Sequence, residues 1–167
     1  MQITVEKLTD YTLLKRAAWA TSGKNVKAPL EAWYECEHSP MRTQIFWVEM
    51  HDIPSYVHVH FRTHSVGITH FVRSNREDRG GDPKADRYTP VVHCMLLNAQ
   101  SLVNLARKRM CLKADKITQF VMNEIAEGVL TVDPDLHKML VPDCVYRNKC
   151  HEVFGTCGYF DGMQKKD

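Results

Sequence analysis

The segment NAQSLVNLARKRM, residues 98–110, has apolar side chains at helical spacing. Intervals of three and four residues between apolar positions are typical of a helix with one buried face. The pattern starts near Met95 with Leu97, Leu102, Leu105, Ala106 and Met110, and it continues in Ile117, Phe120, Val121 and Ile125. The sequence therefore predicts two consecutive helices, and Gly128 is a candidate for a break in the second.

Two polar side chains of this segment could hold an extended ligand. On one continuous helix, Asn98 and Arg109 are eleven residues apart, so both would project from one stripe, about 16 Å apart along the axis. Arginine offers a fixed cationic fork to a phosphate or a pyrimidine carbonyl, and asparagine can donate to and accept from a ring edge or a ribose. A solvated basic face with no ligand would show the same spacing, and this is the commoner meaning of such a pattern.

The rest of the chain predicts a mixture of strands and helices. We expect strands at residues 2–7 and 43–50, a helix at 9–20 that Thr9 or Asp10 caps and Gly23 stops, a second helix at 29–37, and a turn at 51–54. Residues 56–61 alternate like a strand but follow a helix-start signal, so either structure is open. Residues 74–90, rich in charge, glycine and proline, predict an exposed loop that can meet a ligand, and a short helix after Pro134 precedes a cysteine-bearing tail at 141–167.

Length and composition indicate one domain, residues 1–167, with an ordinary hydrophobic core. The net charge of +2 is far from the basic excess of a duplex-binding protein, so nucleic acid is not an expected partner. The apolar runs are too short to span a bilayer, and the first residues lack the layout of a signal peptide. The six cysteines need no disulfide scaffold, which favours a reducing, cytoplasmic setting.

Residues 98–109 are similar to a motif of the flavin-dependent thymidylate synthase family. In that motif Asn-x-Arg-Ser-Leu-x-Asn/His is followed by Leu-Arg at a fixed distance, and the matching positions here are Asn98, Ser101, Leu102, Asn104 and Arg109. HSPMRTQIFWVEMHDIP, residues 38–54, resembles a second family stretch at His38, Ser39, Pro40, Ile53 and Pro54. The family's Arg-His-Arg appears as Thr63-His64-Ser65, and its Ser-x-Arg-Tyr as Ser74-Asn75-Arg76, displaced by one residue.

The resemblance implies an α+β fold, an antiparallel sheet packed with helices, in a shortened, phage-type member located in the host cytoplasm. It implies that Asn98, Asn104 and His64 contact the flavin, and that Ser74, Arg76 and Arg109 bind the nucleotide. In the implied reaction, reduced FAD passes a one-carbon unit from methylenetetrahydrofolate to C5 of dUMP, NADPH supplies electrons, and Arg109 polarises the uracil ring. The resemblance also implies a homotetramer and assigns no metal ligand.

Three alternatives use other residues. Cys144, Cys150, His151 and Cys157 form a zinc ligand set, which would make the chain a zinc-stapled interaction protein, although isolated thiols are more often small buried side chains. His58, His60, His64 and His70 could ligate the metal of a hydrolase, but such histidines are more often partly exposed polar residues. Loss of the signature arginines also fits a family descendant that binds a nucleotide without synthase turnover.

Overall fold

The computed structural model describes residues 1–73 and 75–164. Its strands are β1 (Gln2–Lys7), β2 (Ile45–Pro54), β3 (Ile68–Val72) and β4 (Pro90–Asn98). Its helices are α1 (Tyr11–Ser22), α2 (Leu30–Glu35), α3 (Ser55–Arg62), α4 (Ala99–Arg109), α5 (Lys116–Val132), α6 (Pro134–His137), α7 (Asp143–Tyr146) and α8 (Tyr159–Gln164), with 3₁₀ turns η1 (Ser39–Thr43) and η2 (Glu77–Arg79). The expected α+β class is confirmed.

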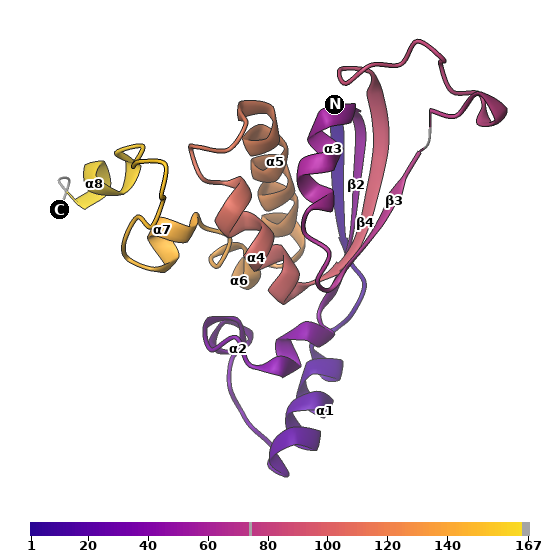
Figure 1. Ribbon diagram of the computed structural model, residues 1–167. Coiled ribbons are helices and arrows are strands. Elements are labelled where there is room, and N and C mark those ends of the chain that lie inside the picture. The colour runs from indigo at the N-terminus through magenta and orange to yellow at the C-terminus, as the bar shows by residue number, and fades with distance from the viewer. Residues whose placement is uncertain (74, 165–167) are drawn as a thin grey trace.

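The four strands form one antiparallel sheet in the order β1-β2-β4-β3. Alternate residues of the two central strands are buried, because side chains of a strand point to opposite faces in turn. One row across the sheet joins Val5, Val48, Met95 and His70 on the inner face. Helices α3, α4 and α5 lie on the same side of the sheet in Figure 1, and the core fills the space between these two layers.

The boundary between β4 and α4 differs from the sequence prediction. Met95, Leu97 and Asn98 belong to β4, and the helix begins only at Ala99. Val91, His93, Met95 and Leu97 alternate with half-buried residues, which is the period of a strand, so the apolar residues before Ala99 contribute to the sheet and not to the helix. The two consecutive helices themselves are present as α4 and α5.

Gly128 does not break α5, which continues to Val132. A Cβ atom added at Gly128 would stand 2.6 Å from Cγ2 of Val5. Glycine at this position therefore lets the helix approach β1 closely. Because Gly128 has no side chain, the two elements can pack against each other here. Local sequence patterns carry no information about such contacts.

The structure also differs from the expectation for residues 51–54, decides between strand and helix for residues 56–61, and shows the ends of helix α1. Residues 51–54, expected as a turn, continue β2 with an irregular register between Met50 and Ile53, where Asp52 takes a positive φ of 58°. Residues 56–61, for which strand and helix were both open, lie in helix α3. The helix start at Asp10 and the stop at Gly23 are confirmed, since Asp10 accepts hydrogen bonds from the amides of Thr12 and Leu13 and Gly23 is left-handed.

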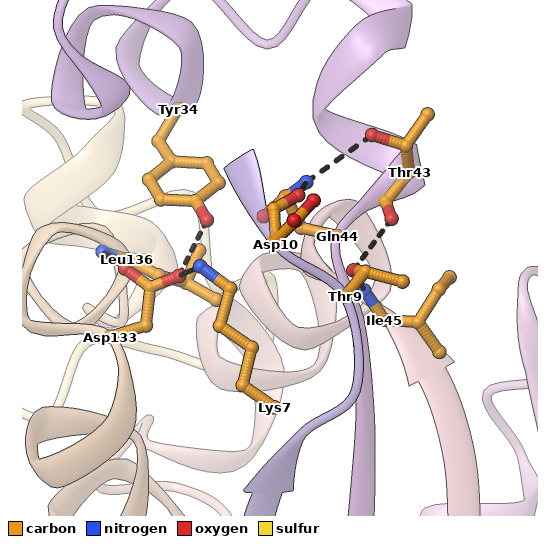
Figure 2. A network of polar contacts seen from close by, with 9 residues as sticks. All are labelled: Lys7, Thr9, Asp10, Tyr34, Thr43, Gln44, Ile45, Asp133 and Leu136. Carbon is orange, nitrogen blue, oxygen red and sulfur yellow. Dashed lines mark hydrogen bonds and ion pairs between the residues drawn. The ribbon is translucent and has the colours of Figure 1, made fainter. Parts of the chain in front are cut away.

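A buried carboxylate ties three distant segments together (Figure 2). Asp133 is 2% exposed, and its Oδ2 accepts from Lys7 Nζ at 2.7 Å and from Tyr34 Oη at 2.6 Å. Its Oδ1 accepts from the amide of Leu136 at 3.1 Å and so caps α6. The side chain thereby joins β1, α2 and the helices α5 and α6.

A second part of the same view fixes the start of β2. Thr9 Oγ1 donates to the carbonyl of Thr43 at 2.8 Å and accepts from the amide of Ile45 at 2.8 Å. The buried Gln44 amide donates to the carbonyl of Asp10 at 3.1 Å. These bonds hold the α1 and η1 segments against the end of the sheet.

No helix within residues 1–73 and 75–164 has both the length and the apolar character needed to cross a membrane.

Candidate functional site

Asn98 is the N-cap of α4 and does not lie on the helix itself. Its Oδ1 accepts a hydrogen bond from the amide of Ser101 at 3.0 Å, which satisfies one of the free donors at the helix start. Its Nδ2 faces Gly67, where an added Cβ would stand only 2.6 Å away and where φ is +72°. The expectation that Asn98 and Arg109 share one stripe of a continuous helix is therefore wrong, because capping turns the Asn98 side chain back toward its own helix.

Arg109 lies at the other end of α4 and bridges to the end of α3. Its Nη2 donates to the carbonyl of His60 at 2.7 Å and to Oγ1 of Thr63 at 2.7 Å. Carbonyls in the last turn of a helix lack partners within the helix, so a guanidinium is a favourable cap there. The Nε atom of Arg109 is buried and has no partner among the described residues. Burial lowers the pKa of this guanidinium without neutralising it, because an arginine remains charged in proteins.

A cavity of about 430 Å³ lies at this end of α4, between the end of α3 and the C-terminal tail. Its size falls at the small end of the roughly 300 to 1,000 Å³ that is usual for small-molecule sites. The basic side chains that line it are His64, Arg107, Lys108, Arg109, Lys113 and His151, and its carboxylates are Asp143 and Glu152. The cations outnumber the carboxylates, so the cavity suits an anionic ligand.

His64, which lines this cavity, is neutral at ordinary pH. Burial lowers its pKa to about 4, and the positive charge of Arg109 adds to the effect, with smaller contributions from His70 and Lys108. The backbone carbonyl of His64 accepts from Nε2 of His70 at 2.8 Å. His64 can therefore present one donor and one acceptor to a ligand beside the Arg109 guanidinium.

The histidines that suggested a metal site separate in the structure. Because residues 56–61 are helical, His60 faces α5, where its Nδ1 lies 2.7 Å from Oγ1 of Thr118. His58 instead packs edge-on against His93 of β4. Within residues 1–73 and 75–164, no three histidine, cysteine, aspartate or glutamate side chains are grouped so that they could hold a metal ion. This applies to the histidines and to the tail residues Cys144, Cys150, His151 and Cys157.

His93 is a residue that sequence reasoning missed. It is fully buried, its Nε2 lies 3.0 Å from Nδ1 of His70, and its own Nδ1 has no partner in the described part of the chain. Burial lowers its pKa to about 3, and the nearby His70, His58 and Arg62 act in the same direction. His93 lies in β4, where buried and half-buried residues alternate, and this alternation is the signal for its burial. The sequence prediction had not identified this strand, so it could not assign His93 to the inner or the outer face of the sheet.

Buried neutral histidines make the stability of the fold depend on pH. Because the folded-state pKa of His93 lies below its unfolded value of about 6.5, its contribution is complete above about pH 6.5 and is lost as the pH falls toward 3. We expect His93 alone to lower the unfolding free energy by roughly 2 kcal/mol between about pH 7 and about pH 5. Urea unfolding at the two pH values measures this difference.

The matched controls for the pH effect are two histidine variants. His93→Gln should reduce the pH dependence by the contribution of His93, whereas substitution of the exposed His38 by glutamine should leave it as steep as in the original chain. An unfolding free energy that is equal at the two pH values, or a slope untouched by His93→Gln, would show that protonation of His93 is not linked to unfolding.

The remaining proposed ligand contacts lie away from the cavity. Asn104 is exposed on α4, with its Oδ1 3.3 Å from Nη1 of Arg107. Arg76 is exposed before η2 and forms a two-pronged ion pair with Asp78, at 2.9 and 2.7 Å. Ser74 lies outside the described residues. Of the predicted site residues that the structure describes, only Arg109 and His64 line the cavity. The ligand roles of all the predicted site residues stay predictions.

Comparisons with solved structures relate the whole fold to known proteins, although no family model and no curated protein matches the sequence. A flavin-dependent thymidylate synthase ThyX from Helicobacter pylori, complexed with FAD and dUMP, matches with a TM-score of 0.67 at 13% identity, over 86% of this chain and 99% of its own. A second structure of Thymidylate Synthase X from Helicobacter pylori, also with FAD and dUMP, gives 0.62 at 14% identity, over 86% of this chain and 99% of its own.

A UMP/dUMP methylase, PolB from Streptomyces cacaoi, bound with 5-Br dUMP, matches with a TM-score of 0.59 at 14% identity, over 83% of this chain and 94% of its own. Each solved chain is covered almost completely, so the similarity concerns the whole architecture and not one motif. The chain therefore has the α+β fold of the flavin-dependent thymidylate synthases.

Proposed function

We propose that the chain is a thymidylate synthase-like protein that binds dUMP or a related pyrimidine nucleotide at the Arg109 cavity and transfers a one-carbon unit to C5 of the ring. The observation that carries this proposal is the Arg109 guanidinium, which is fixed by His60 and Thr63 and keeps a buried Nε that has no partner within residues 1–73 and 75–164. A buried donor without a partner is costly, and a ligand oxygen would satisfy it. The fold shared with dUMP-bound proteins supports the same assignment.

The residues of the cavity would divide the work of binding and activation. Arg109 would contact a carbonyl of the uracil ring and stabilise the negative charge that develops on the ring when C5 reacts. Since its two bonds to α3 already hold the guanidinium in place, little reorganisation would be needed during the reaction. Lys108 and Lys113 line the same cavity and would face the phosphate, and neutral His64 would donate to or accept from the nucleotide.

FAD, when bound, would supply the redox and one-carbon chemistry, with NADPH as the source of electrons and methylenetetrahydrofolate as the source of carbon. Asn104 is exposed and can reach such a ligand. The capping bond of Asn98 uses only its Oδ1, so its Nδ2 can donate to a ligand. Both side-chain amides therefore fit the edge of a flavin ring. Thr63 and Ser65 stand where the family has arginines, and Lys108 and Lys113 are cavity cations that could replace them.

A single copy of the chain does not enclose both ligands in one site. Asn98 and Asn104 do not line the Arg109 cavity, and that cavity is sized for one small ligand. We therefore propose a homo-oligomer, a tetramer by resemblance, in which surfaces of several copies complete the flavin site. Sedimentation of the purified protein as a monomer in the presence of FAD and dUMP would contradict this arrangement.

Absorption spectroscopy tests the flavin part of the proposal. Adding FAD to the purified chain is expected to shift the visible flavin band, and adding dUMP is expected to shift it again because the nucleotide would lie beside the ring. Asn104→Ala should weaken the first shift, while substitution of the equally exposed Asn123 on α5 by alanine should not. A flavin spectrum that is identical with and without the protein would remove FAD from the proposal.

A further inference from the structure

Four of the six cysteines line the cavity that contains Arg109. Cys111 is the second residue after the end of α4, and Cys144, Cys150 and Cys157 come from the tail. All six cysteines are free thiols, and the other two, Cys36 and Cys94, lie elsewhere in the fold. Residues that are distant in sequence thus bring thiols together at the place where we propose that the nucleotide enters.

The tail is held over this cavity by an ion pair, a cation–π contact and a hydrogen bond. Asp143 of α7 pairs with Lys108 at 3.7 Å, and the guanidinium of Arg107 stacks 3.4 Å from the ring centroid of Tyr146. Lys113 Nζ donates to the carbonyl of Phe154 at 3.3 Å. None of the four residues of helix α7 is fully buried, and an ion pair with a partner as exposed as Lys108 contributes little. A covalent bond would change its mobility strongly.

Cys111 and Cys144 are the pair best placed to form such a bond. Both are half-buried, one at the end of α4 and the other in α7, which packs against α4. Burial raises the pKa of the Cys144 thiol, and the charge of a Cys111 thiolate raises it further, ahead of the smaller contribution from Cys150. The two thiols also line the same cavity, one from each side of the α4–α7 contact.

We propose that Cys111 and Cys144 form an oxidation-sensitive pair, whose disulfide fixes the tail over the Arg109 cavity. The Cys111 thiolate attacks one oxygen of hydrogen peroxide, which gives a sulfenic acid and hydroxide. The hydroxide takes up the proton that Cys111 lost and becomes the first water. The Cys144 sulfur then attacks the sulfenic sulfur, the S–O bond breaks as the S–S bond forms, and the departing hydroxide takes up the Cys144 thiol proton to give the second water. Two thiols and one peroxide thus become one disulfide and two molecules of water.

The disulfide would restrict the opening of the tail. It would connect α7 directly to the end of α4 and so reduce the motions that admit a ligand to Arg109 and His64. The formation of the disulfide is independent of the proposed function, whereas its effect on nucleotide entry rests on that function. The two parts are therefore tested separately.

The first test is peptide mapping of the full chain after treatment with hydrogen peroxide and blocking of the remaining thiols. The expected result is one intramolecular peptide pair linking Cys111 to Cys144 and a loss of two of the six free thiols. Cys144→Ser should prevent this loss, while substitution of Cys36 or Cys94 by serine should not. A dominant link between other cysteines, no loss of thiols, or zinc bound to these thiols in the purified protein would overturn the proposal.

The second test compares the rate of dUMP association to the reduced and the oxidised chain. The expected result is a slower association after oxidation, reversed by dithiothreitol and absent in Cys144→Ser. Equal rates in the cross-linked and the reduced chain would overturn the effect on access. If dUMP binds neither form while the Cys111–Cys144 link is found, the proposed function fails and the oxidation-sensitive pair stands.

Discussion

Replacing Asp133 by alanine is expected to lower the unfolding free energy by about 3 to 5 kcal/mol. The carboxylate is 2% exposed and accepts hydrogen bonds from Lys7, Tyr34 and the amide of Leu136. Without it, the Tyr34 hydroxyl and the Lys7 ammonium, whose side chain is only 17% exposed, would lose their partner in a region from which water is largely excluded. Urea unfolding measures the change.

Asp135 provides the matched control for Asp133. It lies on α6, the short helix that Asp133 caps, but its side chain is 39% exposed and pairs with the exposed Lys138 at 3.4 Å. Its replacement by alanine should therefore cost no more than about 1 kcal/mol. If the Asp133 and Asp135 variants unfold at the same urea concentration, the buried network does not carry the stability that we assign to it.

The Asp133 carboxylate also governs the ionisation of Tyr34. Burial raises the pKa of the Tyr34 hydroxyl far above its ordinary value, and the hydrogen bond and charge of Asp133 raise it further. Tyr34 therefore stays protonated and continues to donate to Asp133 throughout the pH range in which the protein is folded. The Tyr34–Asp133 hydrogen bond is consequently insensitive to moderate alkali.

Replacing Arg109 by alanine is expected to weaken dUMP binding by roughly tenfold to 150-fold while the chain remains folded. Hydrogen bonds to a charged group contribute about 1.5 to 3 kcal/mol, and each 1.36 kcal/mol corresponds to a factor of ten. Arg109 is half-buried and caps α3 through the carbonyl of His60, so we expect only a loss of about 1 kcal/mol in stability. Isothermal titration calorimetry with dUMP measures the affinity.

Two further variants separate the geometry of Arg109 from its charge. Arg109→Lys keeps the positive charge but loses the planar fork, so it should restore only part of the affinity. Arg42 is exposed in η1 and does not line the cavity, so its replacement by alanine should leave dUMP binding unchanged. Equal affinities in the original chain and in Arg109→Ala would remove Arg109 from the nucleotide site.

The elements that sequence predicts well are those with strong local signals. Asp10 and Gly23 bound helix α1 because capping chemistry depends on residues next to the helix end. The helical spacing after Ala99 identifies α4, and the resemblance of the same segment to a family motif gives the fold class. Charge, glycine and proline likewise identify the irregular connection that precedes β4.

The elements that sequence leaves open are those decided by tertiary contacts. Residues 56–61 have a strand-like alternation, but Val57 and Phe61 of α3 are buried on one helical face. Gly128 looks like a helix breaker, whereas in the structure it lies within α5 and lets this helix approach Val5 of β1 closely. Propensity is a weak signal when packing of this kind determines the structure.

The candidate site shows the same division. The motif match singled out Arg109, and the structure shows that this residue ends α4 and lines a cavity. The contacts that build the rest of the cavity, between α4 and a tail that begins more than thirty residues later, have no counterpart in any local pattern. The separation of Asn98 from Arg109 was also hidden, because an asparagine that begins a helix and one that lies within it look alike in a periodic sequence.

The most direct test of the nucleotide site is the location of bromine in a crystal of the chain soaked with 5-bromo-dUMP. Anomalous scattering at the bromine edge marks the C5 position of the ring without reference to any assumed pose. We predict one peak per chain inside the cavity lined by His64 and Arg109. A bromine peak that is found only at another surface, with no peak inside this cavity, would contradict the assignment.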